Sequence, residues 1–398
     1  MRLRPHVLVI ACSVTAASAA DWPCWRGPDR NGISLEKGWS PAALARSAKK
    51  AWTADIGAGY SSVAVARERV FTFGNKANND LVQSLEEETG KQVWQYPRPR
   101  RASRYPGPRS TPAVDGSSVY VLDRDGLLIC LDAGTGEPRW TVKLGTAFAA
   151  KPLHWGFACS PLVTDNALIV NINNHGAALD KKTGKKLWTS PSGKSGYASP
   201  VPFVHGGKPR FAVFSPSALC GVDPEAGRLL WSYPWSTKHD ANAADPIVTG
   251  NRAFVSTSYG RGCALLDISG TKPKVLWENK KLQAHTGTPV LLDGHIYGFS
   301  GDIRHGTPLL CLDINTGHAK WTRRMDGTGS LIAADGKLIV LTAKGDLVIV
   351  PASPNGYQEL ARAKVISEGK CWSAPVLANG RIYCRSNQGK LVCVDVGN

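Results

Sequence analysis

The stretch CLDAGTGEPRW, residues 130–140, has a close second copy in CLDINTGHAKW at residues 311–321. In both copies an apolar run ends on Leu-Asp, a Thr-Gly pair follows, and a Trp stands four residues after that glycine. Related copies end at Trp94, Trp188, Trp231, Trp277 and, with Leu in place of Trp, at Leu360. The copies are about 45 residues apart, a period typical of proteins built from repeated supersecondary units.

Each repeat has the same internal order. A small or hydroxyl residue followed by Pro, as in STPAV at 110–114, precedes a turn and an alternating apolar stretch such as SSVYVLD at 117–123. A second turn leads to the apolar run that ends on Leu-Asp, and the Trp lies on the segment after the Thr-Gly turn. Such alternation, bounded by turn residues, predicts four antiparallel strands per repeat, which is typical of a propeller blade.

The repeats predict an all-β protein, an eight-bladed β-propeller of four-stranded antiparallel blades. Seven units are complete, and the eighth, at the C-terminus, lacks a fourth strand. We expect a single domain over residues 21–398, with a leader at 21–50 and with residues 51–56 supplying the missing strand, so that no sheet edge stays open. We expect the following tryptophans to pack between blades: Trp52, Trp94, Trp140, Trp188, Trp231, Trp277 and Trp321.

The first twenty residues have the features of a signal peptide. Arg2 and Arg4 precede a short apolar run, and Ala17-Ser18-Ala19 fits a cleavage site. This pattern predicts export to the periplasm or cell envelope. A second interpretation stays open, in which Cys12 lies in a lipoprotein box and carries a lipid anchor.

The composition limits the partners. The chain has 48 Lys and Arg against 31 Asp and Glu, a formal net charge of +17, which favours anionic partners. Export argues against nucleic acid, and we expect a monomer that binds an envelope protein or an anionic polysaccharide, with contact to a membrane surface as a further option. The absence of a C-x-x-C pair argues against thiol redox chemistry. Cys384 and Cys393 flank a hairpin, so a disulfide between them stays open.

The repeats resemble those of the PQQ-like (pyrroloquinoline quinone) β-propeller family. The resemblance rests on the L-D-x-x-T-G-x-x-x-W phrase and covers residues 21–398. The opening DWPCWRGPDRNGIS, residues 21–34, is similar to the W-x-x-W-R-G-P start of exported bacterial propellers in that group. The family includes quinoprotein dehydrogenases, which bind PQQ and calcium, and the eight-bladed lipoprotein scaffold of outer-membrane β-barrel assembly, to which this chain is closest in size.

Within that family the resemblance favours a scaffold over an enzyme. The chain has few insertions between blades and lacks the adjacent-cysteine pair of the dehydrogenases. No nucleophile elbow, P-loop or H-E-x-x-H motif is present. We therefore expect a non-catalytic exported scaffold with no cofactor and no catalytic residue. Two alternatives stay open, namely a PQQ-dependent dehydrogenase with PQQ and calcium at the channel mouth, and an envelope polysaccharide-binding module.

Most candidate binding residues lie where the chain enters the first strand of a blade, and Arg304 lies in a loop between second and third strands, which we expect on the same face. In a propeller these loops gather around the central channel, and variable loop residues on a regular scaffold are a common place for function. Aromatic and Arg side chains there suit an anionic or sugar ligand. The predicted ligand-binding residues are Tyr60, Arg109, Tyr197, Asn242, Asp245, His285, Arg304 and Trp372.

A basic loop lies in the same region. The segment RPRRASRYPGPR at 98–109 places Arg98, Arg100, Arg101 and Arg104 close together, and we expect them to contact an anionic surface. No histidine pair has metal-ligand spacing, so no metal site is predicted.

Overall fold

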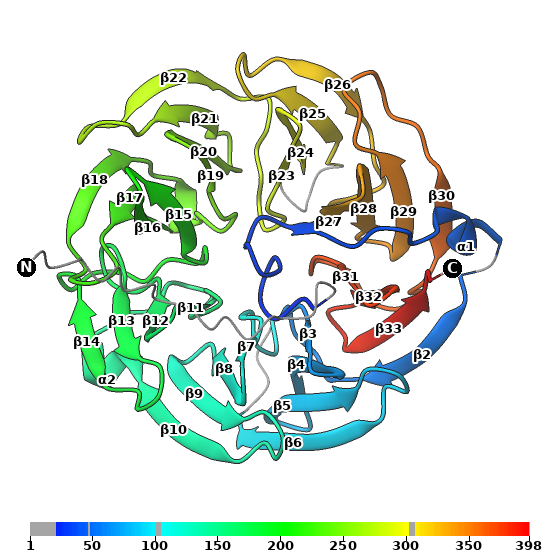
Figure 1. Ribbon diagram of the computed structural model, residues 1–398, viewed down its shortest axis with the longest axis horizontal. Helices are drawn as coiled ribbons and strands as arrows, with labels where there is room; N and C mark the ends of the chain where they lie inside the picture. Colours follow the sequence, from blue (N-terminus) through cyan, green and yellow to red (C-terminus); the bar gives the residue numbers. More distant parts are fainter. Residues whose placement is uncertain (1–20, 47, 101–104, 302–306, 398) are drawn as a thin grey trace, which may run out of the picture.

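Eight four-stranded antiparallel sheets stand around a central axis, as the computed structural model shows (Figure 1). The structure describes residues 21–46, 48–100, 105–301 and 307–397. The signal-peptide and lipoprotein-box predictions for residues 1–20 therefore lie outside the described residues. The eight-bladed propeller predicted from the repeat is confirmed.

The blades follow one another around the ring in chain order (Figure 1). Blades 1 to 4 consist of β3 (Ala64–Ala66), β4 (Arg69–Lys76), β5 (Asn79–Glu86) and β6 (Gln92–Pro99); β7 (Ala113–Asp115), β8 (Ser118–Leu122), β9 (Leu127–Asp132) and β10 (Pro138–Lys143); β11 (Leu162–Val163), β12 (Ala167–Val170), β13 (Ala177–Asp180) and β14 (Lys186–Thr189); and β15 (Val201–His205), β16 (Lys208–Phe214), β17 (Ala218–Val222) and β18 (Leu229–Pro234).

The other four blades complete the ring. Blades 5 to 8 consist of β19 (Ile247–Thr249), β20 (Arg252–Thr257), β21 (Gly262–Asp267) and β22 (Lys274–Asn279); β23 (Val290–Leu292), β24 (His295–Phe299), β25 (Leu309–Asp313) and β26 (Ala319–Arg323); β27 (Gly329–Ala334), β28 (Lys337–Thr342), β29 (Asp346–Pro351) and β30 (Ala361–Lys364); and β31 (Val376–Ala378), β32 (Arg381–Arg385) and β33 (Lys390–Asp395) with β2 (Lys50–Asp55).

Strand β2 closes the ring as predicted. It pairs antiparallel with β33, and Trp52 stands opposite Cys393. The first and last parts of the chain thus share one sheet, so opening the ring requires separating a hydrogen-bonded strand pair. Two helices and one 3-10 turn supplement the strands: α1 (Pro41–Arg46), α2 (Leu144–Phe148) and η1 (Lys238–Asp240). No helix among the described residues is long and apolar enough to span a membrane.

The repeated phrase forms the joint between neighbouring blades. The Trp of one blade packs on the glycine of the Thr-Gly turn in the next blade, and a Cβ on that glycine would lie within 3 Å of the indole at Gly90, Gly136, Gly184, Gly227 and Gly317. These glycines have φ between 67° and 77°, a region that a side chain disfavours. The indole Nε1 also donates to a carbonyl of the next blade in Trp52, Trp94, Trp140, Trp188, Trp277 and Trp321.

Trp231 is the exception at the joint to blade 5. The turn there, LDISGTKPKVLW at 266–277, carries three extra residues before its Trp, which displaces the glycine from the usual position. Within the described residues the Trp231 indole makes no hydrogen bond to the next blade. It remains buried and packs against Phe203 of its own blade, with ring centroids 6.4 Å apart.

The cysteines of the described residues are all free, and they are buried except for Cys24, which is half-buried. Cys393 stands opposite Tyr383 in the ladder, whereas Cys384 stands opposite Val392. Because successive residues of a strand point to opposite faces, the side chains of Cys384 and Cys393 lie on opposite faces of the sheet. The disulfide that the sequence left open between them is therefore not formed. Burial raises the pKa of Cys393 to about 12, so this thiol stays protonated.

Candidate functional site

The loops that lead into the first strands form one end of the channel, which we call the channel mouth. Hydroxyl and carboxylate side chains at the start of these strands connect blades 1 to 6 in succession, and we call this series of bonds the latch. Five hydrogen bonds of 2.7 to 3.0 Å make up this series. In each, the backbone N–H of one residue donates to the side chain of the residue that follows it in this order: Ser62, Thr111, Ser160, Ser199, Asp245, Thr288. This chain of bonds explains the small polar column of the sequence as a structural device.

The leader fills the channel behind this latch. The side chains of Arg26 and Arg30 are only 4% and 3% exposed. Arg30 donates to the backbone carbonyls of Ser160 and Pro200 and to that of Pro161. Two guanidinium groups thus occupy the axis and satisfy carbonyls that the inner strands leave unpaired.

The leader contacts all eight blades through hydrogen bonds, and Figure 1 shows it in dark blue at the centre of the ring. Trp22 pairs with Val65 of blade 1 in both directions. Strand β1 (Ile33–Ser34) runs parallel to β27 of blade 7 and extends that sheet to five strands. The remaining blades are reached through the following residues: Val114, Ser160, Pro200, Asp245, Pro289 and Leu377.

Asp245 belongs to this buried network. Its Oδ1 accepts from the Ser199 N–H at 2.7 Å, and its Oδ2 accepts from the Trp25 indole at 2.6 Å. Burial raises the pKa of Asp245, and the charge of Arg26 opposes that shift. Both carboxylate oxygens are thus engaged inside the protein, and the structure places this predicted binding residue in the joint between leader and blades.

Three other predicted residues come together at the mouth. The rings of Tyr60 and Trp372 stack with centroids 5.5 Å apart and an interplanar angle of 15°. The Arg109 guanidinium lies 5.2 Å from the centre of the Tyr60 ring, and the Lys370 ammonium lies 5.9 Å from the centre of the Trp372 ring. We call this four-layer stack of Arg109, Tyr60, Trp372 and Lys370 the cation–aromatic ladder.

A second aromatic group lies on another part of the mouth. The Tyr197 hydroxyl accepts from the Trp155 N–H at 3.1 Å, and the two rings are in contact. Trp155 reaches His239 edge-on, and Tyr259 lies between His239 and His285. Burial raises the pKa of Tyr197 to about 12. Tyr197 and His285 are therefore linked through three residues that the predicted site did not include.

Two predicted binding residues remain, Asn242 and Arg304. Asn242 is fully buried, and its amide donates to the carbonyls of Ser215, Pro216 and Trp235, so it holds loops together. Arg304 lies outside the described residues.

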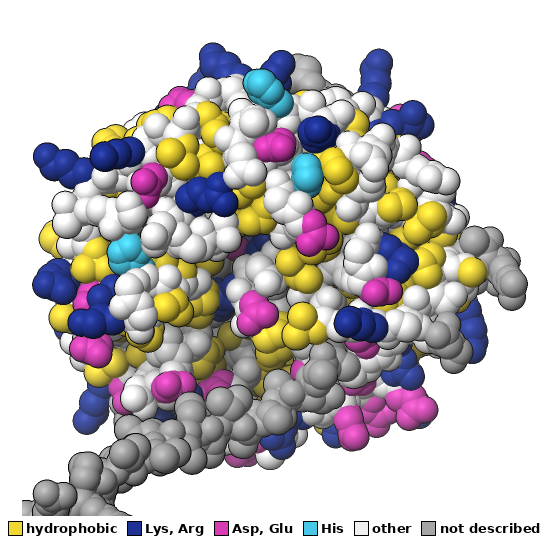
Figure 2. Space-filling model, turned by 45° about the horizontal axis from the view of Figure 1, so that its top comes forward, with side chains coloured by type: hydrophobic (Ala, Val, Ile, Leu, Met, Phe, Trp, Pro, Cys, Tyr) yellow, Lys and Arg dark blue, Asp and Glu magenta, His cyan; other side chains and the backbone are white. Residues whose placement is uncertain are grey.

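Two arginines of the basic loop are paired with carboxylates of blades 1 and 2. Arg98 forms an ion pair with Asp123, and Arg100 forms ion pairs with Asp80 and Asp125. Arg101 and Arg104 lie outside the described residues. Figure 2 shows the same pattern on a larger scale, because Lys and Arg side chains are spread over that view and interspersed with Asp and Glu. The contact of these four arginines with an anionic surface stays a prediction.

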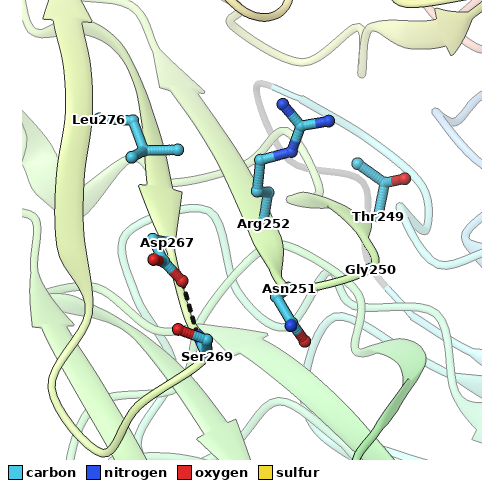
Figure 3. Close-up of a pocket in the computed structure, with 7 residues that line it drawn as sticks. All are labelled: Thr249, Gly250, Asn251, Arg252, Asp267, Ser269 and Leu276. Atoms are coloured by element: carbon cyan, nitrogen blue, oxygen red, sulfur yellow. Dashed lines mark hydrogen bonds between the residues drawn. The ribbon is translucent and has the colours of Figure 1, made fainter.

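A shallow depression lies at the other end of blade 5 (Figure 3). Its lining residues are Thr249, Gly250, Asn251, Arg252, Asp267, Ser269 and Leu276. Asp267 accepts from the Ser269 N–H at 2.8 Å, and Arg252 donates to Asn315 of blade 6. Asp132 and Asp313 make the same turn bond in their own blades. The depression is thus part of the repeat architecture.

Only weak sequence signals mark the residues that the predicted site did not include. Lys370 stands two positions before Trp372, but only the stack shows that its side chain covers that ring. Trp155 lies in the long connection between blades 2 and 3, which has no counterpart in the other repeats. Arg26 and Arg30 belong to the leader, whose path through the channel no spacing rule reveals.

The comparison with known proteins identifies the family. The sequence matches the family described as "Outer membrane protein assembly factor BamB" over residues 78–323 and 309–398. The chain belongs to the BamB family. Its BamB relatives include that of Yersinia pestis, 25% identical over 297 residues, covering 70% of this chain and 72% of the relative. The BamB of Burkholderia pseudomallei is 26% identical over 352 residues, covering 75% of this chain and 86% of the relative.

Solved structures agree on the fold of this BamB-family chain. BamB from Moraxella catarrhalis superimposes with a TM-score of 0.62 at 18% identity, covering 86% of this chain and 97% of the other. A europium-containing methanol dehydrogenase superimposes with a TM-score of 0.72 at 11% identity, covering 92% of this chain and 89% of the other. At these identities the likeness concerns the fold alone.

The mouth residues of this BamB-family chain do not suit PQQ with calcium. Calcium takes six to eight oxygen ligands, usually including several carboxylates. No group of three His, Cys, Asp or Glu side chains that could hold a metal occurs among the described residues. Asp245, a buried carboxylate at the start of the first strands, already accepts from Ser199 and Trp25. The described donor groups therefore offer a divalent cation no pre-formed site.

Proposed function

We propose that this protein is a non-catalytic assembly scaffold of the cell envelope, which binds an envelope protein. The observation that carries the proposal is the match to the BamB family over most of the chain, since that family is described as an outer membrane protein assembly factor. The signal-peptide pattern of residues 1–20 supports a location in the envelope.

The internal structure supports the same role. The leader occupies the channel with two buried arginines, so the axis is built as a solid core. The latch of side-chain bonds fixes the first strands relative to one another. A rigid ring that presents loops on a closed core suits a protein that positions partners, because binding then costs little reordering of the scaffold.

The test is recovery of a partner from the native envelope. The full-length chain, carrying a C-terminal affinity tag, is produced in its own host, cross-linked in intact cells and purified from solubilised membranes. We expect a β-barrel assembly protein of the envelope to co-purify in a defined ratio. Recovery of the chain alone, together with alcohol oxidation after addition of PQQ and calcium, would contradict the proposal.

A further inference from the structure

The cation–aromatic ladder joins three blades at the channel mouth. Tyr60 precedes β3 of blade 1, Arg109 precedes β7 of blade 2, and Trp372 with Lys370 precedes β31 of blade 8. The ladder thus spans the point where the ring closes between the last blade and the first.

The backbone around the ladder is held by hydrogen bonds. The Tyr60 N–H donates to the Pro108 carbonyl at 2.8 Å, and the Ser373 hydroxyl donates to the Tyr60 carbonyl at 2.8 Å. Lys370 and Asn387 exchange two further bonds of 2.8 Å each. The four side chains are therefore presented by ordered backbone, and a partner would meet a surface that is already formed.

A buried cation lies beneath the ladder. Arg385 is 3% exposed and donates to the carbonyls of Ser61, Phe73 and Gly57. Burial lowers the pKa of Arg385 to about 9, so the group remains charged at neutral pH. Its partners are neutral, and the positive charge is not cancelled locally.

Among the described residues, the Arg109 end of the ladder also lacks a counter-charge. Arg109 donates to the carbonyls of Gly107 and Tyr105. Burial, followed by the charge of Arg124, lowers the pKa of Arg109 to about 10, so it too stays charged at neutral pH. Within the described residues no carboxylate contacts Arg109, Lys370 or Arg385. Three cations at one locus, one of them buried, produce a positive potential that a nearby anion would relieve.

The stacking geometry selects the kind of anion. Sugars bind proteins by covering an aromatic face, but the Tyr60 and Trp372 rings stack on each other, and the Arg109 and Lys370 cations lie over these rings. The charged heads that the ladder offers are those of Arg109, which is half-buried, and Lys370, which is exposed. A carboxylate needs only such a head, and a planar guanidinium can bind it through two parallel hydrogen bonds.

We propose that the cation–aromatic ladder is a docking surface for an acidic segment of a polypeptide partner, which places Asp or Glu carboxylates on Arg109 and Lys370. This proposal rests on the scaffold function above and specifies the surface and the partner chemistry. It differs from the prediction that the basic loop contacts an anionic surface, because Arg98 and Arg100 already form ion pairs within the fold.

The experiment measures binding of a defined probe to the full-length exported chain. The probe is a fluorescein-labelled peptide of alternating Asp and Ser, and its uncharged match replaces each Asp with Asn. Fluorescence anisotropy is recorded at low and high salt for the wild type, Arg109→Gln, Lys370→Gln and the control Arg228→Gln. Arg228 is a mostly exposed arginine in the blade 4 turn at the opposite end, and its removal changes the net charge equally.

We expect the Asp peptide to bind, the Asn peptide to bind much less, and salt to weaken the binding. Arg109→Gln should weaken it about tenfold, the loss expected from one charge-assisted hydrogen bond. Lys370→Gln should weaken it by a smaller factor, and Arg228→Gln should leave it unchanged. Thermal unfolding of each variant checks that the fold is kept. If Arg109→Gln does not fold, the comparison of Lys370→Gln with Arg228→Gln tests the proposal.

Two results would overturn the proposal. One is an equal loss in Arg109→Gln and Arg228→Gln, which indicates unspecific attraction to a basic protein. The other is Arg109-dependent binding of polygalacturonate or phosphatidylglycerol vesicles with no binding of the Asp peptide. Either result leaves the scaffold function to its own test, since a co-purifying envelope protein could bind elsewhere on the ring.

Discussion

The indole of Trp94 lies directly on the backbone of Gly136 in the next blade, so that a Cβ added to Gly136 would stand 2.5 Å from the ring. The same indole donates to the Ala133 carbonyl at 3.0 Å, one residue after the Asp of that turn. The Trp of this copy of the repeated phrase thus contacts Ala133 and Gly136 of the next copy. The same pair of contacts recurs at Trp52, Trp140, Trp188 and Trp277.

Gly136→Ala should destabilise the fold by roughly 2–4 kcal/mol, from overpacking against Trp94 added to the cost of a positive φ. The matched control is Gly116→Ala in the same blade, where φ is also positive but nothing lies within 4 Å of the new Cβ. There we expect about 1 kcal/mol. Urea denaturation followed by tryptophan fluorescence measures both variants. Equal losses would show that the Trp94 contact contributes nothing.

The leader should stabilise the whole ring. Arg30→Met keeps the length of the side chain but removes the donors that serve the carbonyls of Ser160, Pro161 and Pro200. We expect a loss of roughly 2–4 kcal/mol, because these carbonyls become buried without a partner. Hydrogen exchange should also rise in β11 and β15, which the leader connects. Arg228→Met, at an exposed position, should change the free energy of unfolding by less than about 0.5 kcal/mol.

The turn carboxylates should make the fold sensitive to acid. A hydrogen bond from Arg139, followed by one from the Thr135 backbone, lowers the pKa of Asp132 to about 2. Because the folded pKa lies below the unfolded one, the stabilisation is complete above about pH 4 and is lost as the pH falls toward 2. After allowance for solvent screening, Asp132→Asn should cost about 1 kcal/mol at pH 7. The difference in stability between the two proteins should shrink as the pH falls from 4 toward 2, and a difference at pH 2 as large as at pH 7 would contradict this account.

The scaffold account predicts no PQQ binding at the channel mouth. Isothermal titration of the full-length chain with PQQ, with and without calcium, should show no saturable heat. The reason is that Asp245 is engaged with Trp25 and Ser199, while Arg26 and Arg30 fill the axis. A saturable, calcium-dependent heat together with a new visible absorbance would favour the dehydrogenase alternative.

The fold could be predicted almost completely from the sequence, because the joint is local and repeated. The spacing between Thr-Gly and Trp sets the register of each blade, and the missing strand of the eighth blade pointed to Trp52. The site could be predicted only in part. Tyr60, Arg109 and Trp372 occupy the same place, before the first strand, in different repeats. The repeat alignment therefore predicted that they lie together at the mouth, as the structure shows.

The other parts depend on contacts between distant segments. Arg98 appeared as a free surface charge, but its partner Asp123 lies in the next blade. Asp245 appeared as a ligand-binding residue, but the leader brings Trp25 to it from 220 residues away. No sequence pattern links Arg98 with Asp123 or Asp245 with Trp25, so these contacts are visible only in the folded ring.

The central claim is that this propeller holds an envelope protein at its channel mouth, and site-specific photo-cross-linking in the native host tests it most directly. A photoreactive amino acid replaces either Gln388, exposed at the mouth next to Asn387, or Lys208, exposed in the hairpin at the opposite end of blade 4. We predict a discrete cross-linked envelope protein from position 388 and little from position 208. A cross-link from position 208 alone, or from neither position, would contradict the claim.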